Sequence, residues 1–191
     1  IANGDWSSDV CSSDLGWMPM CGHDTIGVGT ALVEAGMVEV QEPYTYVTLD
    51  TAAGLVKLQI EVRNCSAVSV TFVNAPAFVM VQDAEIRTGK YGTLRADIAY
   101  GGNIYAILPS ASVGLHINPQ SSMLLIEAGN YLKQRINEQI EVHHPTIPFE
   151  NHVTHIEFYE PTDQEDGAIK NAVIIPPGAI DRSPCGTGTS A

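Results

Sequence analysis

The sequence contains the pattern Cys-Gly-x-x-Thr twice, and each copy stands where a helix is expected to begin. The first copy starts at Cys21 in "PMCGHDTIG", and the second starts at Cys185 in "DRSPCGTGTSA". A cysteine at a helix N-terminus lies beside backbone N–H groups and the positive end of the helix dipole, which lower the pKa of its thiol and attract a carboxylate. Glycine at the next position lets such an anion approach the backbone closely. The fold must therefore accommodate two helix starts of the same kind.

Two such thiols would form a two-base arrangement if they faced each other across one substrate. One thiolate would remove the proton from the carbon next to a carboxylate, and the other thiol would deliver a proton from the opposite face. The stereocentre would then be inverted with no cofactor. The competing interpretation of any cysteine is a small buried hydrophobic residue. It is the only interpretation that Cys65, in "RNCSA", supports.

Composition excludes several classes of function. The chain has 191 residues, of which 45% are hydrophobic, and this is enough for one or two globular domains. A formal net charge of −13 with only nine Lys and Arg residues argues against a nucleic-acid partner, because phosphate binding needs a basic surface. The sequence shows neither a membrane-spanning run nor a signal-peptide pattern, so we expect a cytoplasmic protein with no membrane partner. Four cysteines without a CxxC pair favour reduced thiols, with a disulfide between Cys21 and Cys185 as the alternative.

Hydrophobic periodicity predicts two helices before the second cysteine motif. The stretch "TIGVGTALVEAG" predicts a short helix that ends near Gly36, and residues 119–139 predict a longer amphipathic helix. The expected inner face of the short helix consists of Ile26, Thr30, Val33 and Met37. The expected inner face of the longer helix consists of Leu124, Leu125, Ala128, Leu132 and Ile136.

Eight further runs have the apolar pattern of strands, and "TAAG" forms a hairpin between the first two. The expected strands are residues 44–50, 55–62, 67–73, 84–88, 92–100, 104–109, 153–160 and 171–175. Residues 1–17 show neither helical nor strand periodicity, and we interpret them as an artefactual lead in which Cys11 has no role. A break near Phe78 divides the remainder into residues 18–77 and 78–191.

No metal or cofactor site is expected. On a strand, His152 and His155 of "HVTH" would point to opposite faces and would not converge on a metal ion. The acidic stretch "EPTDQED" at 160–166 lacks the spacing of a calcium loop, and "GTGTSA" lacks the lysine of a phosphate-binding loop. The lysines stand in no context that suggests a Schiff base.

Four stretches of the chain resemble the proline racemase family, and they occur in the family's order. These are "MCGHDTIGVGTALVEAGMV", "DTAAGLV", "AYGGNIYAI" and "DRSPCGTGTSA"; the first and last are specific, whereas the middle two alone would be weak. The resemblance runs from about residue 18 to the end and implies a cofactor-independent racemase or epimerase with Cys21 and Cys185 as its catalytic pair. It also implies an α+β fold like that of diaminopimelate epimerase. In that fold two pseudo-symmetric halves each wrap strands around a central helix, and the site lies between them.

The resemblance further assigns residues to substrate binding. The backbone N–H groups of Gly22, His23, Gly186 and Thr187 would hold the substrate carboxylate. The side chains of His23 and Asp181 would contact the ring nitrogen. Family members are longer than this chain, with one segment before "MCGH" and another after "GTSA".

The expected function is therefore racemisation of proline, a small-molecule substrate. The nearest alternative is 4-hydroxyproline 2-epimerase, which uses the same chemistry on a ring that bears a hydroxyl. A trans-3-hydroxyproline dehydratase is less favoured, because relatives with that activity carry Thr where this chain has Cys185. An inactive fragment is a third alternative, and assembly as a homodimer is left open.

Overall fold

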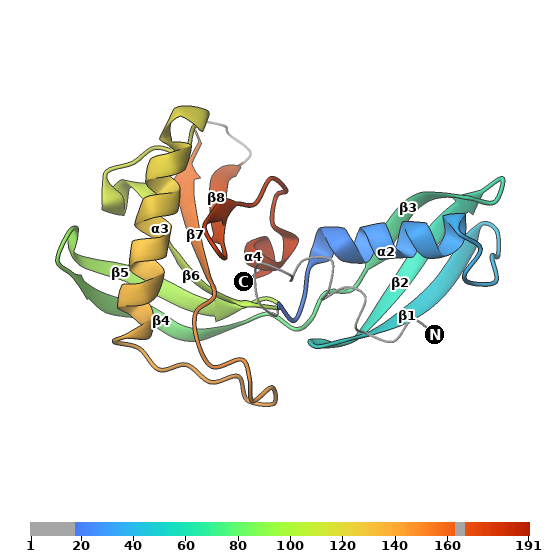
Figure 1. Cartoon of the computed structure of the whole chain (residues 1–191), viewed down its shortest axis with the longest axis horizontal. Coiled ribbons are helices and arrows are strands. Elements are labelled where there is room, and N and C mark those ends of the chain that lie inside the picture. The colour runs from blue at the N-terminus through green and yellow to red at the C-terminus, as the bar shows by residue number, and fades with distance from the viewer. Residues whose placement is uncertain (1–17, 163–166) are drawn as a thin grey trace. The chain divides into compact units, whose positions relative to one another are not determined.

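The computed structural model describes residues 18–162 and 167–191 (Figure 1). The expectations for residues 1–17 and for part of the acidic stretch at 160–166 therefore fall outside the described residues. The chain divides into an N-terminal unit and a C-terminal unit, with the boundary between Ala75 and Pro76, and each unit is described by itself. Whether residues 18–77 and 78–191 are parts of two similar halves stays a prediction.

The N-terminal unit is a three-stranded antiparallel sheet covered by one helix. Its strands are β1 (Tyr44–Thr51), β2 (Gly54–Arg63) and β3 (Ser66–Phe72), in the order β1-β2-β3. All three were expected from the sequence, and the "TAAG" hairpin is confirmed because Thr51 pairs with Gly54. Strict alternation along β2 buries one face of the strand. The residues on that face are Val56, Leu58, Ile60 and Val62.

The helix α2 (Gly22–Glu34) was expected, but of the residues expected on its inner face only Val33 is buried. Ile26 is 43% exposed and Met37, beyond the helix end, is 62% exposed. The residues that face the sheet are Thr25, Gly29, Leu32 and Val33. A Cβ atom on Gly29 would lie only 3.1 Å from Leu58 Cδ1. Small residues therefore face the strands so that the helix backbone can approach them, and the larger Ile26 is turned outward.

The C-terminal unit is built on a six-stranded sheet whose strands follow one another in chain order. They are β4 (Phe78–Thr88), β5 (Gly92–Tyr100), β6 (Ile104–Pro109), β7 (His155–Pro161), β8 (Ile169–Ile175) and β9 (Ala179–Ile180). Neighbouring strands are antiparallel except for β6 and β7, which are parallel. A parallel pair needs a long crossover, and the chain between these two strands contains the helix α3 (Ser122–Asn137). The strand β9 was not expected, because two residues carry no periodicity.

Helix α3 packs against one face of this sheet and contacts β4, β7 and β8 (Figure 1). Its buried residues are Leu125, Ala128, Gly129, Leu132 and Ile136, so the expected face is confirmed except at Leu124, which is exposed. Two short 3₁₀ turns, η1 (Ser110–Val113) and η2 (Pro119–Ser121), lead into it, and α4 (Gly186–Ser190) follows β9. No described helix combines the length and the apolar character needed to cross a membrane.

A buried carboxyl group lies in the segment between α3 and β7. Glu150 is 5% exposed, and its Oε2 atom has no hydrogen-bond partner among the described residues. Its backbone carbonyl accepts a hydrogen bond from the His144 N–H at 2.8 Å, which fixes the segment locally. Burial raises the pKa of Glu150 from 4.5 to about 7. The folded protein therefore holds a proton on Glu150 over a pH range in which the unfolded chain has released it.

This proton makes the stability of the fold depend on pH. Because the folded state binds the extra proton between pH 4.5 and about 7, the free energy of unfolding should fall as the pH rises through that range. Glu150→Gln removes the effect. As the pH rises from 5 to 8, the free energy of unfolding of the variant should therefore increase by about 2 kcal/mol relative to that of the native protein. Urea denaturation of both proteins at the two pH values measures the difference.

His155 acts in the opposite direction, because burial lowers its pKa to about 3 and its contribution to stability grows as the pH rises toward 6.5. This contribution is common to both proteins and cancels in the comparison. The exposed Glu141, in the same segment as Glu150, supplies the control, and Glu141→Gln should leave the pH dependence unchanged. Equal pH dependence in the native protein and Glu150→Gln would contradict the assignment.

Candidate active site

The two copies of Cys-Gly-x-x-Thr have the same backbone function. Cys21 is the N-cap of α2 and Cys185 is the N-cap of α4, so the expectation that each cysteine begins a helix is confirmed. The threonine of each copy donates its N–H to the cysteine carbonyl, from Thr25 to Cys21 at 3.0 Å and from Thr189 to Cys185 at 2.8 Å. This bond closes the first helical turn, so the N–H groups of the residues in between have no partner within the helix.

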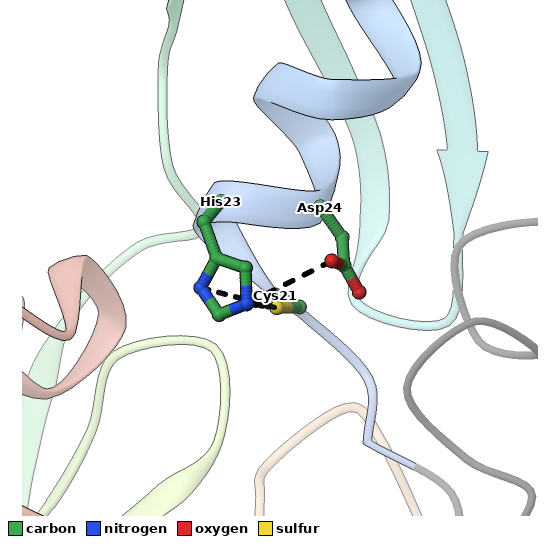
Figure 2. A group of neighbouring side chains, drawn as sticks. All are labelled: Cys21, His23 and Asp24. Atoms are coloured by element: carbon green, nitrogen blue, oxygen red, sulfur yellow. Dashed lines mark hydrogen bonds and ion pairs between the residues drawn. The ribbon is translucent and has the colours of Figure 1, made fainter. Parts of the chain in front are cut away.

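Cys21 lies in a small polar group at the first turn of α2 (Figure 2). Its sulfur is 3.6 Å from His23 Nε2 and 3.8 Å from His23 Nδ1. The same Nε2 atom is 3.7 Å from Asp24 Oδ1. Because both of the shorter contacts involve one ring nitrogen, the imidazole does not relay a proton from the thiol to the carboxylate. The His23 ring therefore lies beside the sulfur without connecting the thiol to the carboxylate.

Side chains that could also serve as metal ligands lie together here, namely Cys21, His23 and Asp24. One ligand atom from each lies within 4.8 Å of the others, and sulfur, nitrogen and oxygen donors suit a zinc ion. The backbone N–H groups of the first turn, however, carry the positive end of the helix dipole. That field opposes a cation and favours an anion at the same place. The local electrostatics therefore favour a carboxylate rather than a metal.

Cys185 lies in a different environment. It is 6% exposed, and its φ of 50° is in the left-handed region, which is uncommon for residues other than glycine. Burial raises the pKa of its thiol and the charge of Asp181 adds to the rise, while hydrogen bonds from Tyr105 and the Gly188 backbone oppose it. The sequence-based expectation of a lowered pKa is therefore wrong for Cys185, because burial outweighs the helix start.

Two side chains of the sheet, the buried Tyr105 and the partly buried Asn171, support the Cys185 loop. The hydroxyl group of Tyr105 on β6 lies 2.6 Å from Thr187 Oγ1 and 3.5 Å from the sulfur of Cys185. Asn171 on β8 donates to Glu157 Oε1 at 3.0 Å and to the carbonyl of Pro184 at 3.1 Å. Sequence reasoning missed these residues, and the one signal available was polar residues within strands that were otherwise apolar.

Asp181 organises the turn that leads to Cys185. Its two carboxylate oxygens accept hydrogen bonds from the N–H of Ser183 at 2.8 Å and from the hydroxyl of Ser183 at 3.0 Å. The same hydroxyl oxygen accepts the N–H of Cys185 at 3.0 Å. These bonds give Asp181 a role in holding the loop. Its contact with a substrate nitrogen stays a prediction.

The turn "YGGN" between β5 and β6 lies directly against α4. A Cβ atom on Gly101 would overlap the carbonyl oxygen of Thr187 and would lie 3.0 Å from the backbone nitrogen of Ala191. Glycine is needed here because two backbone segments meet, and a backbone atom cannot move aside as a flexible side chain can. The motif that carried little information in the sequence therefore positions the helix that follows Cys185.

The expected site residues lie within the two units as two groups. The N-terminal unit holds Cys21, Gly22 and His23 around the start of α2. The C-terminal unit holds Asp181, Cys185, Gly186 and Thr187 around the start of α4. Convergence of the two groups in one site stays a prediction.

Comparison with known proteins finds relatives that are named as racemases and epimerases. The chain is 46% identical over 170 residues to a 4-hydroxyproline 2-epimerase of Allorhizobium ampelinum, covering 89% of this chain and 48% of the relative. It is 40% identical over 176 residues to a proline racemase of Clostridioides difficile, covering 92% of this chain and 52% of the relative. The chain thus spans about half the length of these relatives.

The fold is shared with a solved structure. The crystal structure of a hydroxyproline epimerase from Agrobacterium vitis, with bound trans-4-hydroxy-L-proline, matches with a TM-score of 0.84 and 45% identity. The match covers 91% of this chain and 50% of that one, and it confirms the expected α+β fold. Residues 11–191 match the family model described as "Proline racemase". The chain belongs to the proline racemase family.

Proposed function

We propose that the protein inverts the α carbon of proline by proton transfer between Cys21 and Cys185. The observation that carries the proposal is that both cysteines cap helix starts in a chain whose relatives are named racemases and epimerases. The alternative is 4-hydroxyproline 2-epimerase, which would use the same two thiols. The relatives with these two names are similarly close to this chain, at 40% and 46% identity, so they do not separate the two substrates.

The proposed reaction needs no electron transfer and no added group. The thiolate of one cysteine takes the α hydrogen as a proton, so that an S–H bond forms as the C–H bond breaks. The electron pair left on carbon is delocalised into the carboxylate. The thiol of the other cysteine then gives its proton to the opposite face of the carbon, and the enzyme ends with the two sulfurs exchanged in protonation state.

Binding would rely on the two helix starts. We propose that the backbone N–H groups of Gly22 and His23, with those of Gly186 and Thr187, hold the carboxylate. The side chains of His23 and Asp181 would contact the ring nitrogen. A protonated ring nitrogen beside Asp181 makes the α proton more acidic, which lowers the barrier to its removal.

We propose that Cys185 starts as the acid, which its environment supports. Its thiol has a raised pKa because it is buried, so it carries a proton at neutral pH. Cys21 is partly exposed at the start of α2 and would then supply the thiolate. In the reverse direction the two roles are exchanged.

Two alternatives to racemisation and epimerisation remain. One is disfavoured, and the other is an outcome of the test. Dehydration of trans-3-hydroxyproline is disfavoured, because relatives with that activity carry Thr at the position of Cys185. A chain that is inactive by itself is the third outcome. We therefore propose the assay on protein expressed from the whole reading frame that contains this sequence.

The decisive experiment incubates that protein in deuterated water with L-proline and, separately, with the two epimers of 4-hydroxyproline. We expect optical rotation to decay and deuterium to enter the α position of the substrate. Faster exchange with the hydroxylated ring would assign the epimerase instead of the racemase. If no α deuterium appears with any of these compounds, the two-base proposal is wrong.

A planar carboxylate should protect the two cysteines from alkylation. Pyrrole-2-carboxylate resembles the planar carbanion and should therefore bind more tightly than the substrate. At about 100 times its dissociation constant it should slow iodoacetamide modification of Cys21 and Cys185 by about 100-fold, because only about 1% of the sites stay empty. Site-resolved mass spectrometry measures the rates. The exposed Cys65 is the internal control, and its alkylation should not change.

A further inference from the structure

A chain of three hydrogen-bonding groups lies buried beside α4. Tyr105 is 1% exposed, and its hydroxyl oxygen is 3.5 Å from Cys185 Sγ and 2.6 Å from Thr187 Oγ1. The side-chain amide of Asn103 also donates to this oxygen at 3.5 Å. The family motifs assign no role to Tyr105. Its hydroxyl nevertheless bridges the sulfur and Thr187 by shorter contacts than the direct one, which is 3.9 Å from Cys185 Sγ to Thr187 Oγ1.

The hydrogen bonds among the three groups can run in either direction, and the heavy atoms keep their positions in both cases. When Cys185 is a thiol, its S–H donates to the Tyr105 oxygen and the Tyr105 O–H donates to Thr187. When Cys185 is a thiolate, the Thr187 O–H donates to Tyr105 and the Tyr105 O–H donates to the sulfur. The hydroxyl of Tyr105 keeps its own proton in both states, because burial raises its pKa well above 10.0.

We propose that Tyr105 is a positioning residue that stabilises Cys185 as thiol and as thiolate in turn, through a reversible hydrogen-bond chain that ends at Thr187. This inference rests on the proposed function, in which Cys185 is the acid in one direction and the base in the other. The chain holds the sulfur in one place in both states. It also supplies a donor to the thiolate, which burial would otherwise disfavour.

The other ionisable groups around Cys185 do not supply that stabilisation. Asp181, on the same loop, is a carboxylate and raises the pKa of the Cys185 thiol. Glu157 on β7 is buried, and burial raises its pKa. His155 on β7 lies against the Tyr105 ring at 4.8 Å, and burial lowers its pKa to about 3, so it is neutral at physiological pH. Hydrogen bonds from Tyr105, from the Gly188 backbone and from Thr187 lower the pKa of Cys185, against burial and the charge of Asp181.

The test measures the titration of Cys185 in Tyr105→Phe, which keeps the ring and removes the hydroxyl. Modification by methyl methanethiosulfonate is followed against pH by site-resolved mass spectrometry, on protein from the whole reading frame. The apparent pKa of Cys185 should rise by about one unit, because the thiolate loses a donor. A loss of packing alone would change the rate without moving this midpoint.

Tyr100→Phe is the matched control. Tyr100 is buried to the same extent, and its hydroxyl has no hydrogen-bond partner among the described residues. Its removal should leave the Cys185 midpoint unchanged. Thr187→Val should also raise the midpoint, because it removes both the end of the chain and the direct 3.9 Å contact between Thr187 Oγ1 and Cys185 Sγ, and Thr187→Ser should restore it because the hydroxyl returns. These two variants test the chain even if Tyr105→Phe fails to fold.

Failure of this inference and failure of the proposed function are distinguishable. If the native protein racemises proline or epimerises hydroxyproline but Tyr105→Phe leaves the Cys185 midpoint unchanged, the role of Tyr105 is overturned and the two-base function stands. If the midpoint shifts but the native protein exchanges no α hydrogen, the hydrogen-bond chain stands and the proposed function fails. A shift of the same size in Tyr100→Phe would also overturn the inference.

Discussion

Cys185→Thr should lower racemisation by about 10²- to 10⁴-fold, the usual cost of losing a general acid or base. The threonine hydroxyl has a pKa far too high to serve as a base at neutral pH, and its proton is a poorer donor than that of a thiol. Binding of pyrrole-2-carboxylate should persist, because the proposed anion site consists of backbone N–H groups. Optical rotation measures the loss, and calorimetry measures the retained binding.

Deuterium exchange gives this variant a more specific signature. Cys21 should still remove the α hydrogen that faces it, so one enantiomer should continue to exchange with deuterated water while the other does not. Uniform loss of exchange from both enantiomers would indicate a damaged site rather than a missing acid or base.

The left-handed backbone of Cys185 needs its own control. A β-branched threonine at a φ of 50° is strained by about 1–2 kcal/mol, so misfolding could imitate a catalytic loss. Cys185→Ser carries no such branch and should show the same loss of racemisation. Cys65→Ser changes an exposed cysteine in the β2–β3 turn and should keep native activity. If both Cys185 variants racemised at close to the native rate, Cys185 would not be a base.

The sequence was informative where structure depends on nearby residues. The position of each threonine four residues after its cysteine predicts a first helical turn, since that bond is formed within a few residues. Alternation along β2 likewise predicted its buried face, because the strand period is two. The helix α2 was different. Its length was predictable from nearby residues. Its buried face depended on the distant strand residues Leu58 and Val70, which pack against the helix at Gly29.

The surroundings of Cys185 were not predictable for the same physical reason. Tyr105 and His155 belong to strands that are buried on both faces, so their patterns do not show which side chains meet the sulfur. The raised pKa of Cys185 also follows from burial, which only the packing of the strands determines. Asp181 was expected from the family pattern, and its bonds to Ser183 add a role in the loop that the resemblance did not supply.

Gly101→Ala should be the most damaging small substitution in the C-terminal unit. The added Cβ would overlap the carbonyl oxygen of Thr187. The β5–β6 turn and α4 would have to separate to accommodate it. The added Cβ meets a backbone oxygen, so no change of rotamer relieves the clash. We expect a loss of about 3 kcal/mol in the free energy of unfolding. Urea denaturation measures this loss.

The same substitution should also reduce activity. Thr187 is two residues beyond Cys185, so a displacement of α4 by about 1 Å would misplace the thiol and lower racemisation by about 100-fold. Gly89→Ala is the matched control, because its Cβ would meet only the Tyr131 hydroxyl at 3.8 Å, an ordinary contact. That variant should stay within about 1 kcal/mol of the native stability and keep native activity. Native stability and native racemisation in Gly101→Ala would mean that the close approach of the turn to α4 is not what positions Cys185.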